Sequence, residues 1–452
     1  MAADAAAPGL LIAAPASGSG KTVVTLALLR ALSRAGLAAQ PCKVGPDYID
    51  PAFHAAAAGR PAFNLDPWAM RPATLAQLVG RLGRQADLVV GEGVMGLFDG
   101  AADGTGSTAD LAALTGWPVL LVIDARGQGA SAAALLRGFA GHRADVAVAG
   151  VVFNRVAGAG HAELLARAVA PLGIPLLGWL PRSPALTLPE RHLGLVQAGE
   201  HDGLEDFLDG AAALVARRLD LAAIRGLARP ARLAAAGATA AAGAGVPPLG
   251  QRIAVARDLA FAFAYPALLD QWRAAGAELA VFSPLADEAP GPDADAVYLP
   301  GGYPELHAGR LAGNRRFRAG LGAAAARGAA IFGECGGYMV LGRGLVDAAG
   351  ARHEMAGLLP LESSFAAPAL SLGYRRARLV ADGPLGAAGS DFTGHEFHYA
   401  TIAEEGAGPA LFRCRDARGR DLGAAGRQRG RVGGSFVHLI DRAAARPAEA
   451  VA

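Results

Sequence analysis

A Gly-rich turn near the N-terminus has the residue types and spacing of a phosphate-binding loop. The segment 14–22 reads Ala-Pro-Ala-Ser-Gly-Ser-Gly-Lys-Thr and lies between an apolar run and an amphipathic stretch. In such a turn the backbone N–H groups face phosphate oxygens, the lysine bridges the β- and γ-phosphates, and the threonine hydroxyl ligates Mg²⁺. The strict motif has a glycine where this chain has Pro15. The sequence predicts ATP and Mg²⁺ as cofactors, bound by Gly18, Ser19, Gly20, Lys21 and Thr22.

Lysine is almost absent from the chain. Of its 42 basic residues only Lys21 and Lys43 are lysines, and the remaining forty are arginines. A lysine ammonium is a compact point charge, whereas the arginine guanidinium is a planar fork that needs more room. Both lysines stand in the N-terminal region, which supports phosphate chemistry there. The role of Lys43, toward ATP or toward a substrate carboxylate, stays open.

Acidic residues follow the strands expected in the same region. Asp47 and Asp50 come after the predicted strand 39–43, Glu92 follows 88–91 between two glycines, and Asp99 closes a Met-Gly-Leu-Phe-Asp-Gly segment. The ligand crevice of an open α/β sheet lies at the carboxyl ends of its strands, so these loops meet there. We expect Asp47 and Glu92 to join Thr22 at the Mg²⁺ site, although a solvated turn is the common alternative for such residues. Asn154 either reads the nucleotide base or caps its loop.

A second constellation surrounds Cys335, in the segment Gly-Glu-Cys-Gly-Gly-Tyr. An apolar run enters the cysteine and a helical pattern leaves it, which predicts a sharp strand-to-helix turn that presents the thiol. We expect the helix N-terminus to lower the pKa of this cysteine. Upstream, Gly301 and Gly302 end another strand and can aim N–H groups at an oxyanion. These features predict a cysteine nucleophile.

A cysteine nucleophile needs a base. His438 follows a short strand-like run and is the histidine we expect to serve. His395 and His398, in Gly-His-Glu-Phe-His-Tyr, compete for this role on the sequence alone. Cys42 and Cys414 are expected to be packing residues.

Composition excludes several classes of protein. No window holds the uninterrupted apolar stretch that a membrane span needs, and the N-terminus lacks the pattern of a secretory signal. The 3 cysteines lie far apart, which is typical of a reducing cytoplasm rather than a disulfide framework. A net charge of +2 supplies no broad basic surface for nucleic acid. We therefore expect a soluble cytoplasmic protein that binds neither nucleic acid nor membrane.

Alternating apolar runs and helical stretches predict two α/β domains. The expected strands are 10–14, 88–91, 119–124, 146–153 and 176–179, and then 253–257, 279–283, 296–299 and 329–333. Between them the chain becomes Ala/Gly/Pro-rich without apolar periodicity. The predicted organisation is a P-loop domain over 1–225, a linker over 226–250 and a second domain over 251–445.

Taken together, these motifs resemble the cobyrinic acid and hydrogenobyrinic acid a,c-diamide synthase family. The resemblance spans nearly the whole chain and rests on the order of its segments, which are Ala-Pro-Ala-Ser-Gly-Ser-Gly-Lys-Thr, Lys-Val-Gly-Pro-Asp-Tyr-Ile-Asp-Pro, Glu-Gly-Val-Met-Gly-Leu-Phe-Asp-Gly, Leu-Pro-Gly-Gly-Tyr-Pro-Glu, Gly-Glu-Cys-Gly-Gly-Tyr and Gly-His-Glu-Phe-His-Tyr. The proline in the P-loop is also what this family shows. The resemblance implies a dethiobiotin-synthetase-like P-loop domain with a parallel sheet, followed by a class I glutamine amidotransferase α/β domain of the cobyric acid branch.

The resemblance also implies roles for residues. Cys335 matches the glutaminase nucleophile and His438 the group that activates it. Most amidotransferases of this class carry a glutamate two residues after the histidine, where this chain has Ile440, so what orients His438 stays open. The positions implicated in binding or activating tetrapyrrole carboxylates are matched by Asp47, Tyr48, Ile49, Glu92 and Asp99.

The implied activity is a ligase that forms C–N bonds with glutamine as amido donor. ATP would activate the a and c acetate carboxylates of a tetrapyrrole, and ammonia released from L-glutamine would displace phosphate. Whether the macrocycle is metal-free or holds cobalt, and in which order it is amidated, stays open. Cobyric acid synthase and nickel-sirohydrochlorin a,c-diamide synthase are related alternatives, and a P-loop switch or partition ATPase with a degenerate glutaminase module is an unrelated one. A homodimer is common among such P-loop domains.

Overall fold

The chain folds as two units in a computed structural model that describes residues 7–183, 186–187, 190–191, 194–195, 197–233 and 245–444. One unit comprises Met1–Trp68 and Pro72–Ala242, and the other comprises Ala69–Arg71 and Gly243–Ala452. The expected linker 226–250 falls where the second unit begins, and its residues 234–244 lie outside the described part of the chain.

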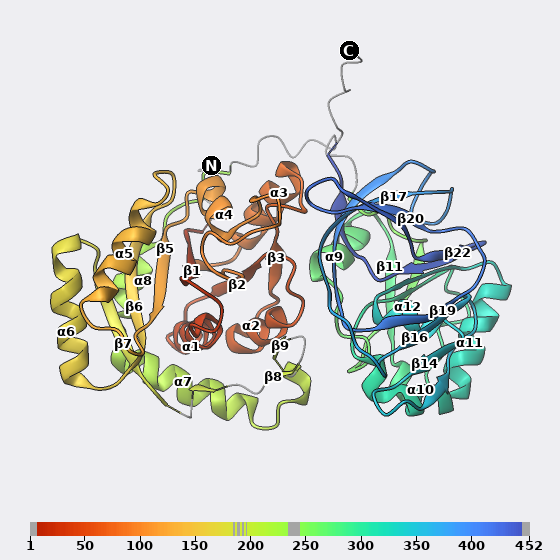
Figure 1. The fold of residues 1–452 in the computed structure, drawn as a ribbon, viewed down its shortest axis with the longest axis horizontal. Helices are drawn as coiled ribbons and strands as arrows, with labels where there is room; N and C mark the ends of the chain where they lie inside the picture. Colours follow the sequence, from red (N-terminus) through yellow and green to blue (C-terminus); the bar gives the residue numbers. More distant parts are fainter. Residues whose placement is uncertain are drawn as a thin grey trace, which may run out of the picture. The chain divides into compact units, whose positions relative to one another are not determined.

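A seven-stranded sheet organises the N-terminal unit (Figure 1). Its strand order is β3-β2-β4-β1-β5-β6-β7, and every neighbouring pair is parallel. The strands are β1 Gly9–Ala13, β2 Ala39–Val44, β3 Phe63–Leu65, β4 Leu88–Glu92, β5 Val119–Asp124, β6 Val148–Val156 and β7 Leu176–Pro181. The central strands β1, β2 and β4 are buried along their whole length, as expected of a parallel sheet covered on both faces.

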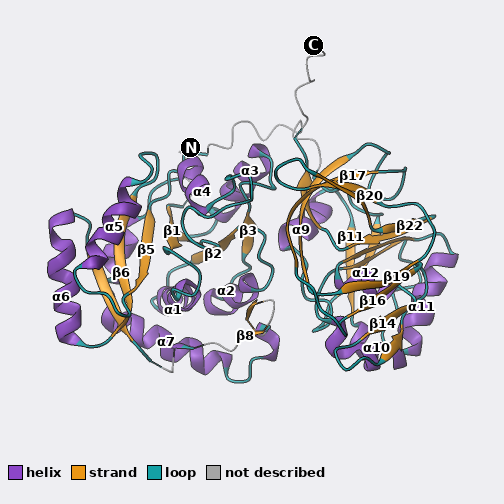
Figure 2. Ribbon diagram, in the orientation of Figure 1, coloured by secondary structure: helices purple, strands orange, loops and turns teal. Residues whose placement is uncertain are grey.

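Helices connect the strands of this unit and lie around its sheet (Figure 2). They are α1 Lys21–Arg34, α2 Asp50–Ala58, α3 Pro72–Leu82, α4 Thr108–Thr115, α5 Ser131–Gly141, α6 Ala159–Val169, α7 Leu204–Arg218 and α8 Leu221–Leu227, with 3₁₀ helices η1 Ala170–Leu172 and η3 Ala198–Glu200 and a small ribbon of β8 Glu190–Arg191 and β9 Gly194–Leu195. Helix α1 buries an apolar face that includes Val24 and Leu28, so the phosphate-loop residues at its start are held by the core.

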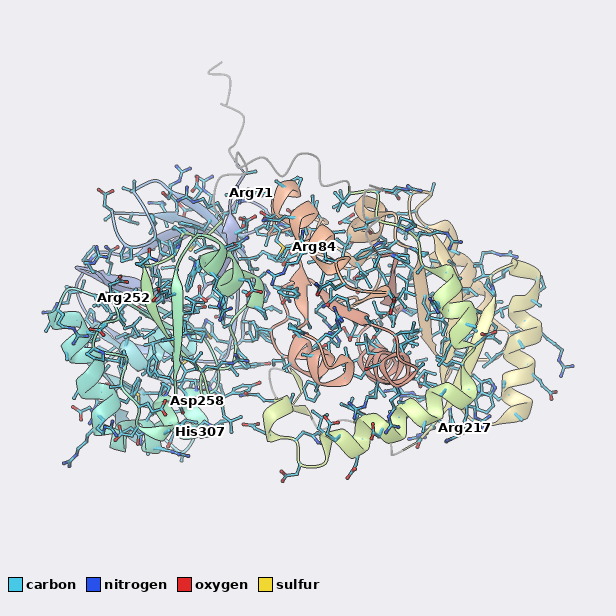
Figure 3. All side chains as sticks on the ribbon, turned by 180° about the vertical axis from the view of Figure 1, so that it is seen from behind. Arg71, Arg84, Arg217, Arg252, Asp258 and His307 are labelled. Atoms are coloured by element: carbon cyan, nitrogen blue, oxygen red, sulfur yellow. The ribbon has the colours of Figure 1, made fainter. Side chains whose placement is uncertain are left out.

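The second unit contains a six-stranded sheet in the order β11-β10-β12-β13-β23-β22, parallel except for its last pair. Its strands are β10 Arg252–Ala256, β11 Glu278–Phe282, β12 Ala296–Leu299, β13 Ala330–Glu334, β22 Arg427–Arg429 and β23 Val432–Ser435. Its helices are α9 Pro266–Ala274, α10 Ala308–Gly313, α11 Arg315–Ala326 and α12 Gly336–Leu341, with η4 Pro284–Ala286 and η5 Pro304–His307. In Figure 3, Arg252 at the start of β10 and Asp258 beyond its end are labelled, and Asp258 marks the carboxyl edge of the sheet.

Two further sheets of the second unit were not predicted. One has the order β15-β14-β16-β19 and the other β21-β20-β17-β18-β24. Their strands are β14 Gly344–Val346, β15 Arg352–Glu354, β16 Leu361–Ser364, β17 Ser371–Leu379, β18 Asp391–His398, β19 Thr401–Glu405, β20 Phe412–Arg415, β21 Asp421–Ala425 and β24 His438–Arg442. Strand β17 contains three arginines and a glycine and buries only part of its length, so it lacks the apolar run that marks a core strand.

The strands predicted from apolar runs are all present, with ends shifted by at most a few residues. Examples are β5, at its predicted bounds, and β13, which begins and ends one residue later than expected. Within the described residues, no helix is long and apolar enough to cross a membrane.

Candidate active sites

The Gly-rich turn lies between β1 and α1, as its sequence predicts. Gly18 and Gly20 have φ values of 74° and 91°, in the region that favours glycine. The Asn154 Nδ2 donates to the Ser19 carbonyl oxygen at 3.0 Å, and a Cβ on Gly20 would collide with that same amide nitrogen. Asn154 therefore holds the turn directly. The sequence left open whether Asn154 reads the nucleotide base or caps a loop. In the structure its side-chain amide contacts the backbone of the phosphate loop.

A cavity of about 520 Å³ opens beside this turn. It brings together four of the predicted loop residues and Asn154, and its lining is Gly18, Gly20, Lys21, Thr22, Val23, Arg126, Asn154, Arg155, Pro181, Arg182, Ser183, Leu186 and Thr187. Arg155 donates to the Gly18 carbonyl oxygen and to Asp124 Oδ2, each at 2.6 Å. The three lining arginines were not predicted. The available signal was their position at the carboxyl ends of β5, β6 and β7: Arg155 lies within the last residues of β6, and Arg126 and Arg182 follow β5 and β7.

Behind the turn, buried charges converge on Glu92, the last residue of β4. Its Oε1 accepts from Thr22 Oγ1 at 2.7 Å and lies 3.0 Å from Lys43 Nζ. Its Oε2 lies 2.5 Å from His54 Nε2, and neither of these two side chains is exposed to solvent. Lys43 Nζ also bonds Asp50 Oδ2 at 2.5 Å. The structure thus brings Thr22, Glu92 and Lys43 together. His54 was missed because one histidine in an Ala-rich helix gives no periodic signal.

The other predicted residues of this unit occupy the surrounding loops. Asp47 Oδ1 accepts the backbone N–H groups of Ile49 and Asp50, and its Oδ2 lies 3.7 Å from Lys43 Nζ. Tyr48 and Ile49 are buried. Asp99 Oδ2 accepts the Gly96 N–H at 2.9 Å. Asp47 therefore reaches the Glu92 cluster through Lys43 rather than by direct contact.

Burial and charge set the protonation of this cluster. Burial lowers the pKa of Lys21, opposed by the carboxylates of Glu92, Asp50 and Asp99. Burial alone would raise the pKa of Glu92, but Lys43 and His54 hold it well below its ordinary value. Burial would lower the pKa of Lys43, and its carboxylate neighbours raise it instead. Glu92 is therefore ionised and Lys43 charged.

The oxygen atoms of Thr22 and Glu92 fit a hard divalent cation. Mg²⁺ at phosphoryl-transfer sites takes one or two protein oxygens and completes its shell with water and phosphate. Among the residues that the structure describes, no group of three or more His, Cys, Asp and Glu side chains is arranged to hold a metal. At such a site Thr22 and Glu92 would supply the protein oxygens, and water and the phosphates of a bound nucleotide the remaining ligands.

In the second unit, Cys335 sits where β13 turns into α12. Its φ of 48° is outside the ordinary region for a residue with a side chain, which marks a strained turn. The Cys335 N–H donates to the Ser435 carbonyl oxygen at 2.8 Å, so pairing with β23 fixes the turn. Only 3% of Cys335 is exposed. The predicted strand-to-helix turn is confirmed.

Gly301 brings the cysteine and one histidine to the same point. A Cβ built on Gly301 would lie 3.0 Å from His438 Nε2 and 3.2 Å from the Cys335 Cβ, and would collide with His438 Cε1. Only glycine fits between the two side chains. Gly302 follows it, and the amide nitrogen of Gly302 lies 3.0 Å from a Cβ built on Gly336, the first residue of α12. Cys335, His438, Gly301 and Gly302 therefore form one cluster.

The competing histidines are differently placed. His398 Nε2 bonds Glu396 Oε1 at 2.9 Å, and its Nδ1 lies 3.0 Å from the Ala400 carbonyl oxygen. Its ring stacks on Phe436 at 4.0 Å. His395 stands opposite His438 in the β18–β24 pairing, with its ring against Tyr374. The geometry favours His438 as the partner of Cys335.

The expected low pKa of Cys335 is wrong. Burial raises the pKa of the thiol, the Glu305 carboxylate adds to the rise, and a backbone hydrogen bond from Gly336 opposes it. Burial lowers the pKa of His438 to about 3, helped by His395 and His398. The α12 helix has only six residues, so its dipole does not outweigh desolvation. The resting pair is a neutral thiol and a neutral imidazole.

Comparison with known proteins matches both units. Residues 10–196 match a CobQ/CobB/MinD/ParA nucleotide binding domain, and residues 252–445 match a CobB/CobQ-like glutamine amidotransferase domain. Three similar relatives are each named hydrogenobyrinate a,c-diamide synthase. The protein of Brucella suis biovar 1 (strain 1330) is 58% identical over 96% of this chain and 98% of its own length. Those of Rhizobium meliloti (strain 1021) and Rhodobacter capsulatus are 57% and 55% identical, over 96% of this chain and 99% and 98% of their lengths.

Fold and comparison together define a nucleotide-binding domain joined to a glutamine amidotransferase domain. Identity of 55–58% along nearly the full length narrows this class. The chain belongs to the hydrogenobyrinate a,c-diamide synthase family, as the order of its motifs predicted.

The Lys43 network supports a stability prediction. Replacing Lys43 with Met leaves Asp50 and Glu92 buried without their ammonium, and we expect a loss of about 3–5 kcal/mol in the free energy of opening of this unit. Native-state hydrogen exchange of β2 and β4 amides in the full chain measures it. Arg34→Met, which removes a half-exposed partner of Asp209, is the control and should cost less than about 1 kcal/mol. Equal costs would contradict the buried-network account.

The neutral Cys335–His438 pair makes a pH prediction. Because the thiol pKa is raised, the thiolate fraction at neutral pH is small and grows about tenfold for each pH unit. Alkylation of Cys335 by iodoacetamide, followed by peptide mass spectrometry, should therefore accelerate steadily between about pH 6 and pH 9. A rate that is already high and constant from about pH 5 to pH 8 would instead indicate a thiolate–imidazolium pair.

Proposed function

We propose that this protein catalyses the ATP- and glutamine-dependent amidation of the a and c acetate carboxylates of hydrogenobyrinic acid, a step of cobalamin biosynthesis. The observation that carries the proposal is the similarity to hydrogenobyrinate a,c-diamide synthases, which covers both units rather than one. A switch or partition ATPase would not need the Cys335 and His438 cluster. The names of these relatives favour the metal-free macrocycle, which the sequence motifs alone left open beside the cobalt form.

The N-terminal unit activates the carboxylate. A substrate carboxylate oxygen attacks the γ-phosphorus of ATP, ADP leaves, and an acyl phosphate forms. Lys21 and the loop N–H groups stabilise the charge on the phosphoryl oxygens. Thr22 and Glu92 are the residues that would hold Mg²⁺, which supplies further charge neutralisation there. Asn154 supports the loop from behind.

The second unit supplies ammonia. The Cys335 sulfur attacks the side-chain amide carbon of glutamine while its proton passes to His438 Nε2. The N–H groups near Gly301 and Gly302 face the oxyanion that develops. His438 then gives the proton to the departing ammonia, which leaves a γ-glutamyl thioester for water to hydrolyse. Because the thiol of Cys335 and the imidazole of His438 are both neutral at rest, the thiol must lose its proton to His438 as the sulfur attacks.

The tetrapyrrole and its surroundings complete the proposal. The residues expected to bind the tetrapyrrole lie in loops at the carboxyl ends of strands of the N-terminal unit; they are Asp47, Tyr48, Ile49 and Asp99. Substrate carboxylates would meet the γ-phosphate of ATP at this edge of the sheet. Asp47 is a less suitable Mg²⁺ ligand than Glu92, because its Oδ1 already accepts two backbone N–H groups. A cytoplasmic location and a homodimer stay predictions.

The division of labour between the units predicts the behaviour of Cys335→Ser. This variant should lose glutamine-dependent amidation by at least about 100-fold, because serine is a far weaker nucleophile here, and keep the wild-type rate with ammonium chloride. Product is measured by liquid chromatography with hydrogenobyrinic acid as substrate. Cys414→Ser, at another buried cysteine of the same unit, is the matched control and should keep both activities. Equal loss with both nitrogen donors would refute the assignment of Cys335.

A further inference from the structure

Glu334, the residue before Cys335, was not singled out by its sequence. It is the last residue of β13, it is 1% exposed, and its Oε2 lies 3.9 Å from His438 Nδ1. Position 440, two residues after the histidine, holds a buried isoleucine that offers no carboxylate. We propose that Glu334 is the positioning residue of this glutaminase, and that its carboxylate orients His438 and stabilises the imidazolium that forms during attack.

Two hydrogen bonds hold the Glu334 carboxylate in place. The Tyr298 hydroxyl on β12 donates to Oε2 at 2.7 Å, and the backbone N–H of Leu439 donates to Oε1 at 3.0 Å. Leu439 is the residue after His438, so the second bond ties the histidine's own strand to the carboxylate. A buried carboxylate bound from two strands is a rigid acceptor. It has one oxygen directed to the histidine side.

The orientation of the imidazole agrees with this role. Nε2 faces the Gly301 and Cys335 side of the ring, and Nδ1 faces Glu334. For Nε2 to accept the thiol proton, the resting proton of the neutral ring must sit on Nδ1. A carboxylate beside Nδ1 selects that tautomer and then faces a full positive charge once the proton has moved. The ionised carboxylate balances this charge and takes no proton itself, so the proton ends on His438.

The separation of 3.9 Å is longer than a hydrogen bond, and attack shortens it for a physical reason. A neutral Nδ1–H attracts the carboxylate weakly, whereas an imidazolium forms a charge-assisted bond. Catalytic hydrogen bonds are often long before substrate binds. Burial raises the pKa of Glu334 to about 7, opposed by the bonds from Tyr298 and Leu439. Burial therefore disfavours the ionised form of Glu334 while His438 is neutral, and a positive charge on His438 stabilises that form.

The arrangement differs from one built along the histidine strand. Alternate residues of a strand face the same side, so a carboxylate at position 440 would come from the strand of His438 and lie on the same face as the histidine. Here the carboxylate comes from the central sheet and belongs to the residue adjacent to the nucleophile. One strand end thus places both the sulfur and the group that supports its base.

Glu334→Gln in the full-length enzyme tests the inference, which rests on the proposed glutaminase role of Cys335. With hydrogenobyrinic acid, ATP and Mg²⁺ present, we expect kcat for glutamate formation to fall about 100-fold with KM within about threefold, because the amide cannot balance an imidazolium. Ammonia-dependent amidation should stay at the wild-type rate. Glu362→Gln, which makes the same change at a carboxylate of this unit that pairs with Arg352, is the matched control and should retain kcat within about twofold.

Nitrogen-15 NMR of His438 supplies a second measurement, which reports the tautomer directly. In the wild-type enzyme at neutral pH, Nδ1 should carry the proton, and Glu334→Gln should weaken that preference. A dominant Nε2–H tautomer in the wild type would overturn the proposal. So would an unchanged kcat in Glu334→Gln, or an equal loss of glutamine and ammonia activities in that variant, which would indicate a structural role. If the glutaminase role itself is wrong, the wild type forms no glutamate, which separates the two failures.

Discussion

The carboxyl ends of parallel strands are the constraint on which both candidate sites depend. In a parallel sheet every strand delivers its following loop to the same edge. In the N-terminal unit, β1 leads into the phosphate loop, β2 into the Asp47 loop, and β4 ends on Glu92 itself. In the second unit, β12 leads into Gly301 and β13 ends on Glu334 beside Cys335. Residues that are distant in sequence become neighbours because their strands pair in register.

Close packing at these edges limits which residues the sequence can use. Gly20 must lack a side chain because Asn154 occupies the space, and Gly301 must lack one because His438 and Cys335 approach from either side. The same crowding buries the ionisable groups. In the first unit burial is balanced by opposite charge, so Glu92 and Lys43 stay ionised. In the second unit burial outweighs the Glu396 carboxylate at His438, and nearby carboxylates add to the effect of burial at Cys335, so both groups rest in their neutral forms.

The parts of each site that could be predicted are those whose function restricts the backbone. The phosphate loop and the Cys335 turn need glycines at fixed spacing before a helix, and that spacing is visible in the sequence. Side chains that act through contacts with distant strands were not visible. His54 and Glu334 are single residues in ordinary elements, and only their contacts in the folded chain show that they reach Glu92 and His438. The prediction of a low pKa for Cys335 was wrong because the residues around a cysteine in the sequence do not show how deeply it is buried. The two further sheets of the second unit were not predicted because arginine and glycine interrupt the apolar patterns of their strands.

In the proposed reaction, one chain moves nitrogen from the amide of glutamine onto carboxylates that ATP has activated. The most direct test incubates the full-length enzyme with hydrogenobyrinic acid, ATP, Mg²⁺ and [amide-¹⁵N]glutamine. The mass of the product is then measured by mass spectrometry. We expect a diamide with ¹⁵N in both new amides and no product when ATP is omitted. Hydrolysis of ATP and glutamine without transfer of ¹⁵N to the macrocycle would contradict it.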